Sequence, residues 1–192
     1  MSTQKSKGHY LPPLQKRVVL HLAKRGAQTI NETVTGIKGH YKSSWISFNA
    51  LEKKKLVKKI DVKNYRGNNY PRFWLSVGGV LIALLEGASS QDLLEKTAKV
   101  YPNDEVLQLV LEMAPFTGVE GYRIGLSAIL AKGKLEESDA ITIIMTQMEK
   151  DLSAEQFNQV LELLKKHPAQ YKELTKQIDQ LTKLLQKMKD RI

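Results

Sequence analysis

The chain has 192 residues, of which 42% are hydrophobic and 26% are charged, a composition that is typical of globular proteins and excludes disorder along the whole length. Cysteine is absent, so disulfides, thiol nucleophiles and zinc sites that use thiolate are excluded. The formal net charge of +10 is confined to one part of the chain: residues 1–87 hold 16 Lys or Arg against four Asp or Glu, whereas residues 88–192 hold 14 against 16. Such asymmetry predicts that the first part binds a polyanion, with nucleic acid as the expected partner, because a lysine-rich surface that serves only solubility would spread its charge more evenly.

Residues 1–11 carry Lys5 and Lys7 but no apolar stretch behind them, so they do not resemble a secretory signal and are expected to form a disordered tail. The longest apolar or glycine stretch, residues 77–85, is much shorter than the roughly 20 residues that a membrane-spanning helix needs. We therefore expect a cytoplasmic protein with no membrane partner.

Two helices are predicted before residue 36. Residues 12–25 begin with two prolines and carry apolar residues four positions apart, and Gly26 follows as a stop. Thr29 is expected to cap a short second helix over residues 30–35.

The segment that follows predicts a helix-turn-helix. Residues 36–39 form a tight turn whose two glycines can supply the positive φ that such a corner needs. Ser43 or Ser44 is expected to cap a third helix that ends near Lys54. Two short helices joined by a glycine-containing turn are typical of this motif.

After the third helix the hydrophobic period changes from 3.6 to 2. Residues 57–63 alternate imperfectly, residues 64–69 are rich in types that tolerate positive φ, and residues 70–75 form a second apolar run. This pattern predicts a β-hairpin with a basic tip. Ser76 is expected to cap a buried helix over residues 77–86.

Residues 88–168 have helical periodicity throughout, which predicts an all-helical domain. Ser153 and Gln156 fit a capping box at the start of its last helix. The expected helices cover residues 91–101, 104–114, 119–132, 139–150 and 154–167.

Residues 169–192 carry a heptad pattern and are expected to form a short coiled-coil helix. The flanking positions are mostly Thr and Gln, so charge does not choose the partner, and pairing of two identical chains into a homodimer is the economical interpretation. In the alternative interpretation, the helix packs onto helices of its own chain. The apolar seam consists of Tyr171, Leu174, Ile178, Leu181, Leu185 and Met188.

No residue pattern typical of an enzyme is found. The four histidines are far apart and lack metal-ligand spacing. Residues 125–128 lack the second glycine of a nucleophile elbow, and Gly133-Lys134 is followed by Leu135 instead of the Ser or Thr of a phosphate-binding loop. We therefore expect no catalytic residues, no metal and no cofactor.

Two segments carry a family resemblance. Residues 50–57 read ALEKKKLV and end the third predicted helix, and residues 73–76 read FWLS and end the hairpin. With the order of elements over residues 12–87, they resemble winged-helix transcription regulators of the MarR and PadR kind, whose pattern Leu-Glu-x-x-Gly-Leu-hydrophobic has Lys55 here in place of its glycine. The resemblance implies a mostly α-helical protein with a small β-wing, in which residues 12–87 are a winged-helix DNA-binding domain and residues 169–192 mediate dimerisation.

The resemblance also implies a role for each part of this domain. The third helix would lie in the major groove, and short polar or apolar side chains on it would read base edges: Ser43, Ile46, Ser47, Asn49 and Ala50. Lysines around this helix and the first strand would contact phosphates: Lys42, Lys53, Lys54, Lys58 and Lys59. The wing residues would be Tyr65, Arg66, Tyr70 and Arg72, with Arg66 in a minor groove.

The expected function is sequence-specific binding of double-stranded DNA by a dimeric transcription regulator. A non-specific nucleoid or RNA-binding protein would share the basic charge and is the first alternative. A winged helix used only for protein interaction is the second, and the charge of residues 1–87 argues against it. Residues 88–168 suit either a domain that binds a small-molecule effector or a plain scaffold.

Overall fold

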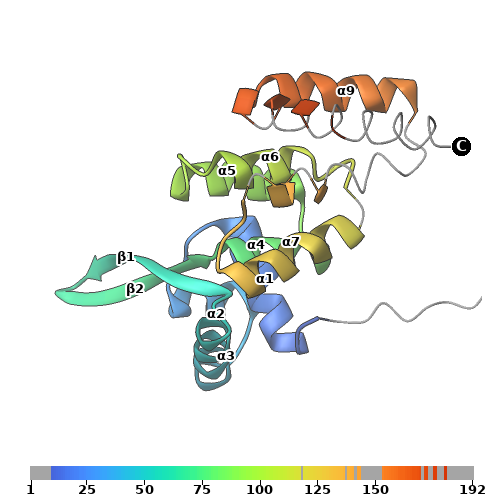
Figure 1. The fold of residues 1–192 in the computed structure, drawn as a ribbon. Coiled ribbons are helices and arrows are strands. Elements are labelled where there is room, and N and C mark those ends of the chain that lie inside the picture. The colour runs from blue at the N-terminus through green and yellow to red at the C-terminus, as the bar shows by residue number, and fades with distance from the viewer. Residues whose placement is uncertain are drawn as a thin grey trace, which may run out of the picture. The chain divides into compact units, whose positions relative to one another are not determined.

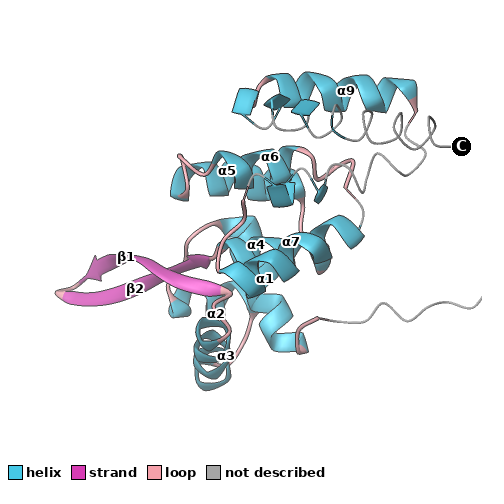
Figure 2. Ribbon diagram, viewed as in Figure 1, coloured by secondary structure: helices cyan, strands magenta, loops and turns pink. Residues whose placement is uncertain are grey.

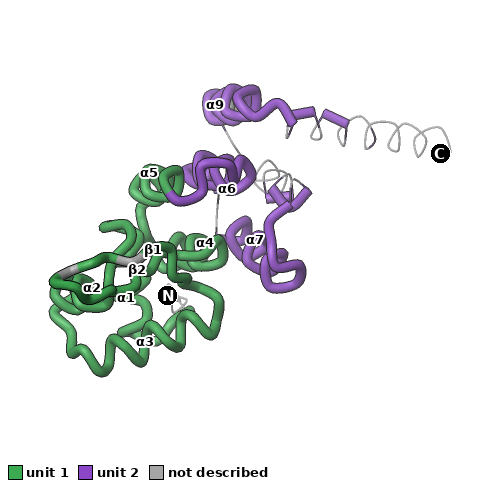
Figure 3. Tube along the Cα trace, turned by 90° about the vertical axis from the view of Figure 1, so that its left-hand side faces the viewer, with its two compact units in different colours: residues 1–99 green, residues 100–192 purple. Residues whose placement is uncertain are grey.

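The computed structural model describes residues 10–117, 119–136, 138–140, 142–143, 153–169, 171–172, 175–176 and 180. The chain divides into two compact units, residues 1–99 and residues 100–192 (Figure 3). The first unit thus extends beyond residue 87, where the predicted DNA-binding domain ends. As expected from the sequence, the described residues are mostly helical with a small antiparallel sheet (Figure 2).

The elements follow one another along the chain as labelled in Figure 1. The first unit contains α1 (Pro13–Arg25), α2 (Ile30–Ile37), α3 (Tyr41–Lys53), β1 (Val57–Tyr65), β2 (Asn68–Leu75), α4 (Val77–Leu85) and most of α5 (Ser90–Val100). The second contains α6 (Glu105–Glu112), α7 (Val119–Lys132) and α9 (Ala154–Lys165). Within the described residues no helix is long and apolar enough to cross a membrane.

One hydrophobic core joins the elements of the first unit. α1 packs against α2, α3 and α4, and β2 packs against α1, α2 and α4. Each large apolar side chain that is fully buried in this core stabilises the fold by roughly 1.5–3 kcal/mol. Its largest fully buried side chains are Leu22, Phe48, Leu51, Trp74, Leu75 and Leu81.

α2 begins as the sequence predicts but ends two residues later. The Thr29 hydroxyl accepts the backbone N–H of Glu32, and the Glu32 carboxylate accepts the N–H of Thr29, so both halves of a capping box are present. The helix continues through Gly36 to Ile37, and Lys38, with φ of 49°, takes the left-handed conformation that ends it. The prediction that Gly36 ends the helix is therefore wrong. This glycine instead lets α2 approach α1, since a Cβ there would lie 2.1 Å from Cε1 of His21.

α3 begins at Tyr41, before the two serines that were expected to cap it. His40 occupies the N-cap and its side chain makes no capping hydrogen bond. Ser44 is buried inside the helix, which excludes it as a cap, and Ser43 lies in the helix as well. The physical reason is the position of Phe48 and Leu51 in the core, which requires the preceding turn of helix to pack there too.

β1 and β2 form a two-stranded antiparallel hairpin, and Gln28 adds an isolated bridge to Phe73. The register shifts between Lys59 and Asp61, so that Ile60 has no partner of its own and forms a β-bulge. This bulge accounts for the imperfect alternation of the sequence. The turn is tighter than predicted, with only two residues between the strands.

α4 is buried on nearly all sides, as its composition predicts, and the Ser76 hydroxyl caps it by accepting the N–H of Gly79 at 3.1 Å. Glu86 follows the helix and its side chain is 2% exposed. Its carboxylate accepts the N–H of Leu11 at 2.9 Å and pairs with Lys16 at 2.8 Å. This residue therefore ties the end of α4 to the start of α1.

In the second unit the Tyr122 hydroxyl donates to the carbonyl of Ala114 at 2.8 Å, and Nε2 of His167 lies 3.2 Å from the Glu112 carboxylate. The capping box predicted at Ser153 and Gln156 is confirmed. Most of the predicted helix over residues 139–150 lies outside the described residues. So do the apolar seam positions beyond Tyr171 and residues 1–9 of the predicted tail. The prediction of a disordered tail up to residue 11 is wrong at its end, because Leu11 is 4% exposed and its N–H donates to Glu86.

Candidate nucleic-acid interface

α3 divides into a core face and a face that is open to solvent. Four buried residues, Ser44, Ser47, Phe48 and Leu51, follow the helical period and form one stripe. The ring of Phe48 packs on that of Phe73 in β2, with 4.9 Å between centroids and a tilt of 47°. This contact fixes the rotation of α3, and the opposite face is left without cover from the first unit.

Three large side chains stand on the open face of α3. Tyr41, Trp45 and Ile46 are 54%, 48% and 53% exposed, although such residues are usually buried. Sequence reasoning named only Ile46 among them. A helical wheel with Ser44 and Phe48 inside would not have found Tyr41 or Trp45, because Tyr41 lies seven residues before Phe48 on the same side of the helix and Trp45 lies at the edge of that side.

The predicted base-reading residues divide between the two faces. Ser43 and Ile46 are exposed, and Asn49 and Ala50 are half-buried at the edge of the open face. Ser47 is only 6% exposed, which corrects its assignment, because a position four residues before Leu51 belongs to the core stripe. The structure thus brings four of the five residues to or beside the open face.

All five predicted phosphate-contacting lysines are exposed. Lys54 donates to the amide oxygen of Gln15 at 3.0 Å, and Lys59 pairs with Glu52 at 3.6 Å while it lies 5.9 Å above the Phe73 ring. Lys42 and Lys53 make no ion pair with any residue that the structure describes. A weak surface pair such as that of Lys59 contributes about 1 kcal/mol or less, so an external anion can replace the Glu52 carboxylate as its partner.

The hairpin projects from the helices of its unit (Figure 1). Arg66 and Gly67 form its tip with φ of 52° and 76°, and two successive positive values are typical of a type I′ turn. Arg66 and Tyr70 are exposed, whereas the side chain of Tyr65 lies outside what the structure describes. The tip is therefore a basic, solvent-exposed point on a narrow ribbon.

Arg72 does not lie at the tip. Its guanidinium is half-buried at the base of the hairpin, where Nη2 donates to the carbonyl of Ala27 at 2.7 Å and Nη1 contacts the Asp61 carboxylate at 3.3 Å. The bond to Ala27 holds β2 against the segment before α2, and the contact with Asp61 joins β2 to β1. Arg72 thus lies in the hairpin, as predicted, and also has a role inside the fold, while its contact with nucleic acid stays a prediction.

A second link joins the hairpin to the helix-turn-helix. The Glu32 carboxylate on α2 accepts a hydrogen bond from Lys63 on β1, in addition to its capping bonds with Thr29. Burial alone would raise the pKa of Glu32, but the ammonium of Lys63 and the capping bonds outweigh burial and hold that pKa below its ordinary value. Glu32 is therefore ionised at neutral pH and keeps the outer part of β1 beside α2.

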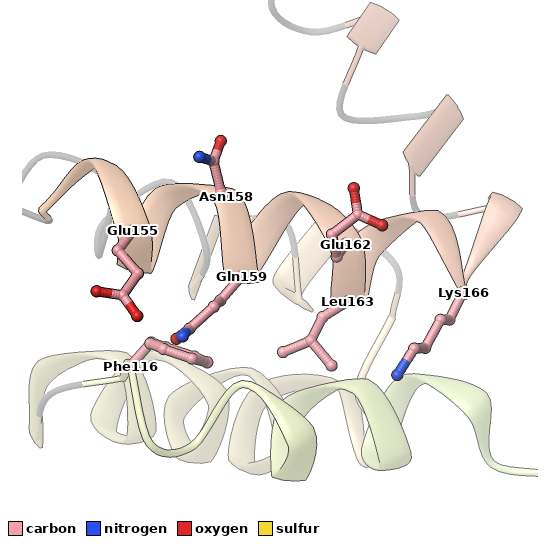
Figure 4. A pocket seen from close by; sticks show the side chains of 7 residues that line it. All are labelled: Phe116, Glu155, Asn158, Gln159, Glu162, Leu163 and Lys166. Carbon is pink, nitrogen blue, oxygen red and sulfur yellow. The ribbon is translucent and has the colours of Figure 1, made fainter.

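Two hollows away from the open face of α3 are lined by described residues. One of about 540 Å³ lies between α1 and α2, where burial and the nearby Arg25 lower the pKa of His21. The other, of about 710 Å³, lies between α9 and Phe116, with Gln159, Leu163 and Lys166 directed toward it (Figure 4). No group of three or more potential metal ligands occurs among the residues that the structure describes. The open face of α3, with the lysines around it and the hairpin tip, is the candidate interface.

Comparisons with known proteins add no evidence about this interface. No family model matches the sequence, and neither the curated proteins nor the solved structures contain a significant match.

Proposed function

We propose that residues 12–87 form a winged-helix domain of the MarR and PadR kind and that the protein binds double-stranded DNA sequence-specifically as a transcription regulator. In this proposal α3 enters the major groove, where Ser43, Ile46, Asn49 and Ala50 meet base edges. The surrounding lysines contact phosphates, and Arg66 reaches a minor groove. The apolar seam of residues 169–192 pairs two chains, so that each dimer reads two half-sites.

The observation that carries the proposal is the open face of α3. The Phe48 and Phe73 packing orients the helix so that Trp45 and Ile46 face solvent, and a major groove is wide enough to receive one α-helix. Lys42 lies within this face, and Lys53 lies at the end of the helix. An exposed helix with polar, methyl-contacting and cationic groups together has the chemistry that direct base reading requires.

Selection of bound duplexes from a random DNA pool tests the proposal. We expect a pseudo-palindromic motif with half-sites about one helical turn apart, roughly 34–36 Å. Asn49→Ala should relax the preference at one position, whereas Lys42→Ala should weaken binding to all sequences alike and flatten the salt dependence by about one unit of slope. The two variants serve as controls for each other, since both replace a polar α3 side chain with alanine.

The salt dependence separates the outcomes. If about six phosphates are neutralised by each chain, log K falls with log salt at a slope near −0.9 for each contact. A duplex affinity that does not change between low and physiological salt would refute the nucleic-acid proposal. A strong salt dependence without a selected motif would favour the non-specific alternative.

One observation favours that alternative as a second candidate. Tyr41 and Trp45 are four residues apart on the same exposed face, with Lys42 between them in sequence, and exposed aromatic rings beside cations are typical of stacking on unpaired bases. A competition between single strands and duplexes of equal length tests it. Trp45 emission in a Trp74→Phe variant reports stacking directly, because Trp74 is fully buried and would otherwise add a constant signal.

A further inference from the structure

Among the described residues, three residues other than glycine have positive φ, and all three are basic. They are Lys38 at 49°, Lys55 at 55° and Arg66 at 52°. The left-handed conformation is normally left to glycine, with Asn and Asp as the usual exceptions, because a Cβ approaches the following carbonyl oxygen. A lysine or arginine at such a position destabilises the fold relative to glycine, which makes its side chain a candidate for a role outside the fold.

Lys38 and Lys55 occupy the same position in two equivalent helix ends. After α2 the N–H of Lys38 donates to the carbonyl of Thr35, and the next N–H donates to Val34. After α3 the N–H of Lys55 donates to Glu52 at 2.9 Å, and the next N–H donates to Leu51 at 2.9 Å. This pair of bonds defines a Schellman motif, whose left-handed residue is usually glycine.

The same unit contains a glycine in the equivalent place. At the end of α4 the N–H of Gly87 donates to Leu84 and the N–H of Ala88 donates to Ala83, and Gly87 has φ of 95°. The chain therefore uses glycine where a Schellman motif ends α4, but lysine at the two ends that flank α3.

No contact within the described part of the protein accounts for either lysine. Both side chains are exposed, and neither ammonium group makes a hydrogen bond or an ion pair with another described residue. In contrast, Lys54, Lys59 and Lys63 all have partners. The ammonium groups of Lys38 and Lys55 are therefore available to an anion from outside the chain.

We propose that Lys38 and Lys55 are phosphate contacts that bracket α3, kept as lysine at a cost in stability. The proposal rests on the proposed function and extends it to two residues that sequence reasoning did not assign. One lysine precedes α3 and the other follows it, and a helix of 13 residues is about 20 Å long. The two residues therefore lie at opposite ends of the helix, where each ammonium group can meet a phosphate of the DNA that receives it.

Two substitutions at each position separate backbone strain from charge. Lys38→Gly and Lys55→Gly remove both, whereas Lys38→Gln and Lys55→Gln remove the charge and leave a side chain in the left-handed conformation. We expect each glycine variant to raise the Tm of the full-length protein by about 2–4 °C, and each glutamine variant to leave it within about 1 °C. All four should bind a labelled duplex of mixed sequence about two- to fivefold more weakly, with a salt slope smaller by about 0.9.

The outcomes distinguish this inference from the proposed function. Wild-type protein that shows no salt-dependent duplex binding refutes the proposed function, and this inference with it. Wild-type binding with unchanged affinity and slope in both glycine variants refutes the inference alone. Glycine variants that lose affinity without any gain in Tm would overturn the claim that these two lysines destabilise the fold.

Discussion

Glu86 is the buried charge whose removal gives the sharpest test of how the first unit is held together. Its carboxylate is 2% exposed, and its partners include the ammonium of Lys16 and the backbone N–H groups of Leu11 and Tyr10. Glu86→Gln keeps an acceptor for Leu11 but removes the ion pair. Breaking a buried pair costs about 3–5 kcal/mol, and since Lys16 remains 27% exposed we expect a loss of about 2–3 kcal/mol in the free energy of unfolding at pH 7.

The effect should depend on pH with a definite sign. Burial alone would raise the pKa of Glu86, but the hydrogen bonds from Lys16 and Leu11 outweigh it and hold the pKa below its ordinary value. The folded state therefore favours the ionised carboxylate. The resulting stability is fully present above the pKa of an unfolded glutamate and is lost as pH falls through the lower folded value.

Urea unfolding of the wild type and Glu86→Gln from neutral to acidic pH measures this difference. Glu95→Gln is the matched control, because the ion pairs of Glu95 with Lys96 and Lys99 are screened by water and their removal should leave stability nearly unchanged. The free-energy gap between the wild type and Glu86→Gln should narrow as the solution becomes acidic. A gap that is absent at neutral pH, or the same at every pH, would refute this account of Glu86.

Three further predictions concern packing, the hairpin tip and assembly. Gly79→Ala should destabilise the first unit by at least about 3 kcal/mol in thermal unfolding, because the new Cβ would lie 1.9 Å from the carbonyl oxygen of Leu56; a stable variant would mean that this approach is looser than described. Arg66→Ala should weaken DNA binding by about 1–3 kcal/mol and change stability by less than about 0.5 kcal/mol, and equal losses of folding and binding would contradict its place at the tip. Ile178→Glu combined with Leu181→Glu should leave the winged helix folded, abolish the dimer in sedimentation and reduce DNA affinity by about 10²-fold. A wild type that is already monomeric at micromolar concentration would assign the seam to the chain's own core.

Local chemistry explains which parts of the fold the sequence predicts well. Thr29, Ser76 and Ser153 were expected to cap helices, and all three hydroxyls accept the hydrogen bond that a cap requires. Caps involve neighbours three residues apart, so the sequence contains both partners. The switch from helical to alternating periodicity likewise placed the hairpin correctly, because burial on one face decides it.

The errors arise where tertiary packing overrides a local signal. Ser44 has the chemistry of a cap, but packing of Phe48 draws it into the core, and Ser47 follows for the same reason. The partners of Arg72, Ala27 and Asp61, are brought to its guanidinium only by the fold, so its role in holding the hairpin could not be predicted. In the candidate interface, the exposure of Trp45 depends on the rotation of α3, which no short window of sequence reveals.

The bulge at Ile60 separates two halves of the hairpin that differ in how they are held. On one side of it Val57, Phe73 and Trp74 are buried among the helices, and on the other side residues from Asp61 to the tip are largely exposed. The outer half can turn as a lever about a pivot at the bulge only when the contacts of Lys63 with Glu32 and of Arg72 with Ala27 are released. Its five residues from Asp61 to Tyr65 span about 16 Å, so a rotation of about 10° at the pivot displaces the tip by about 3 Å. In the proposed DNA complex, release of these contacts would let Arg66 follow grooves of different width while the core that anchors the hairpin stays unchanged.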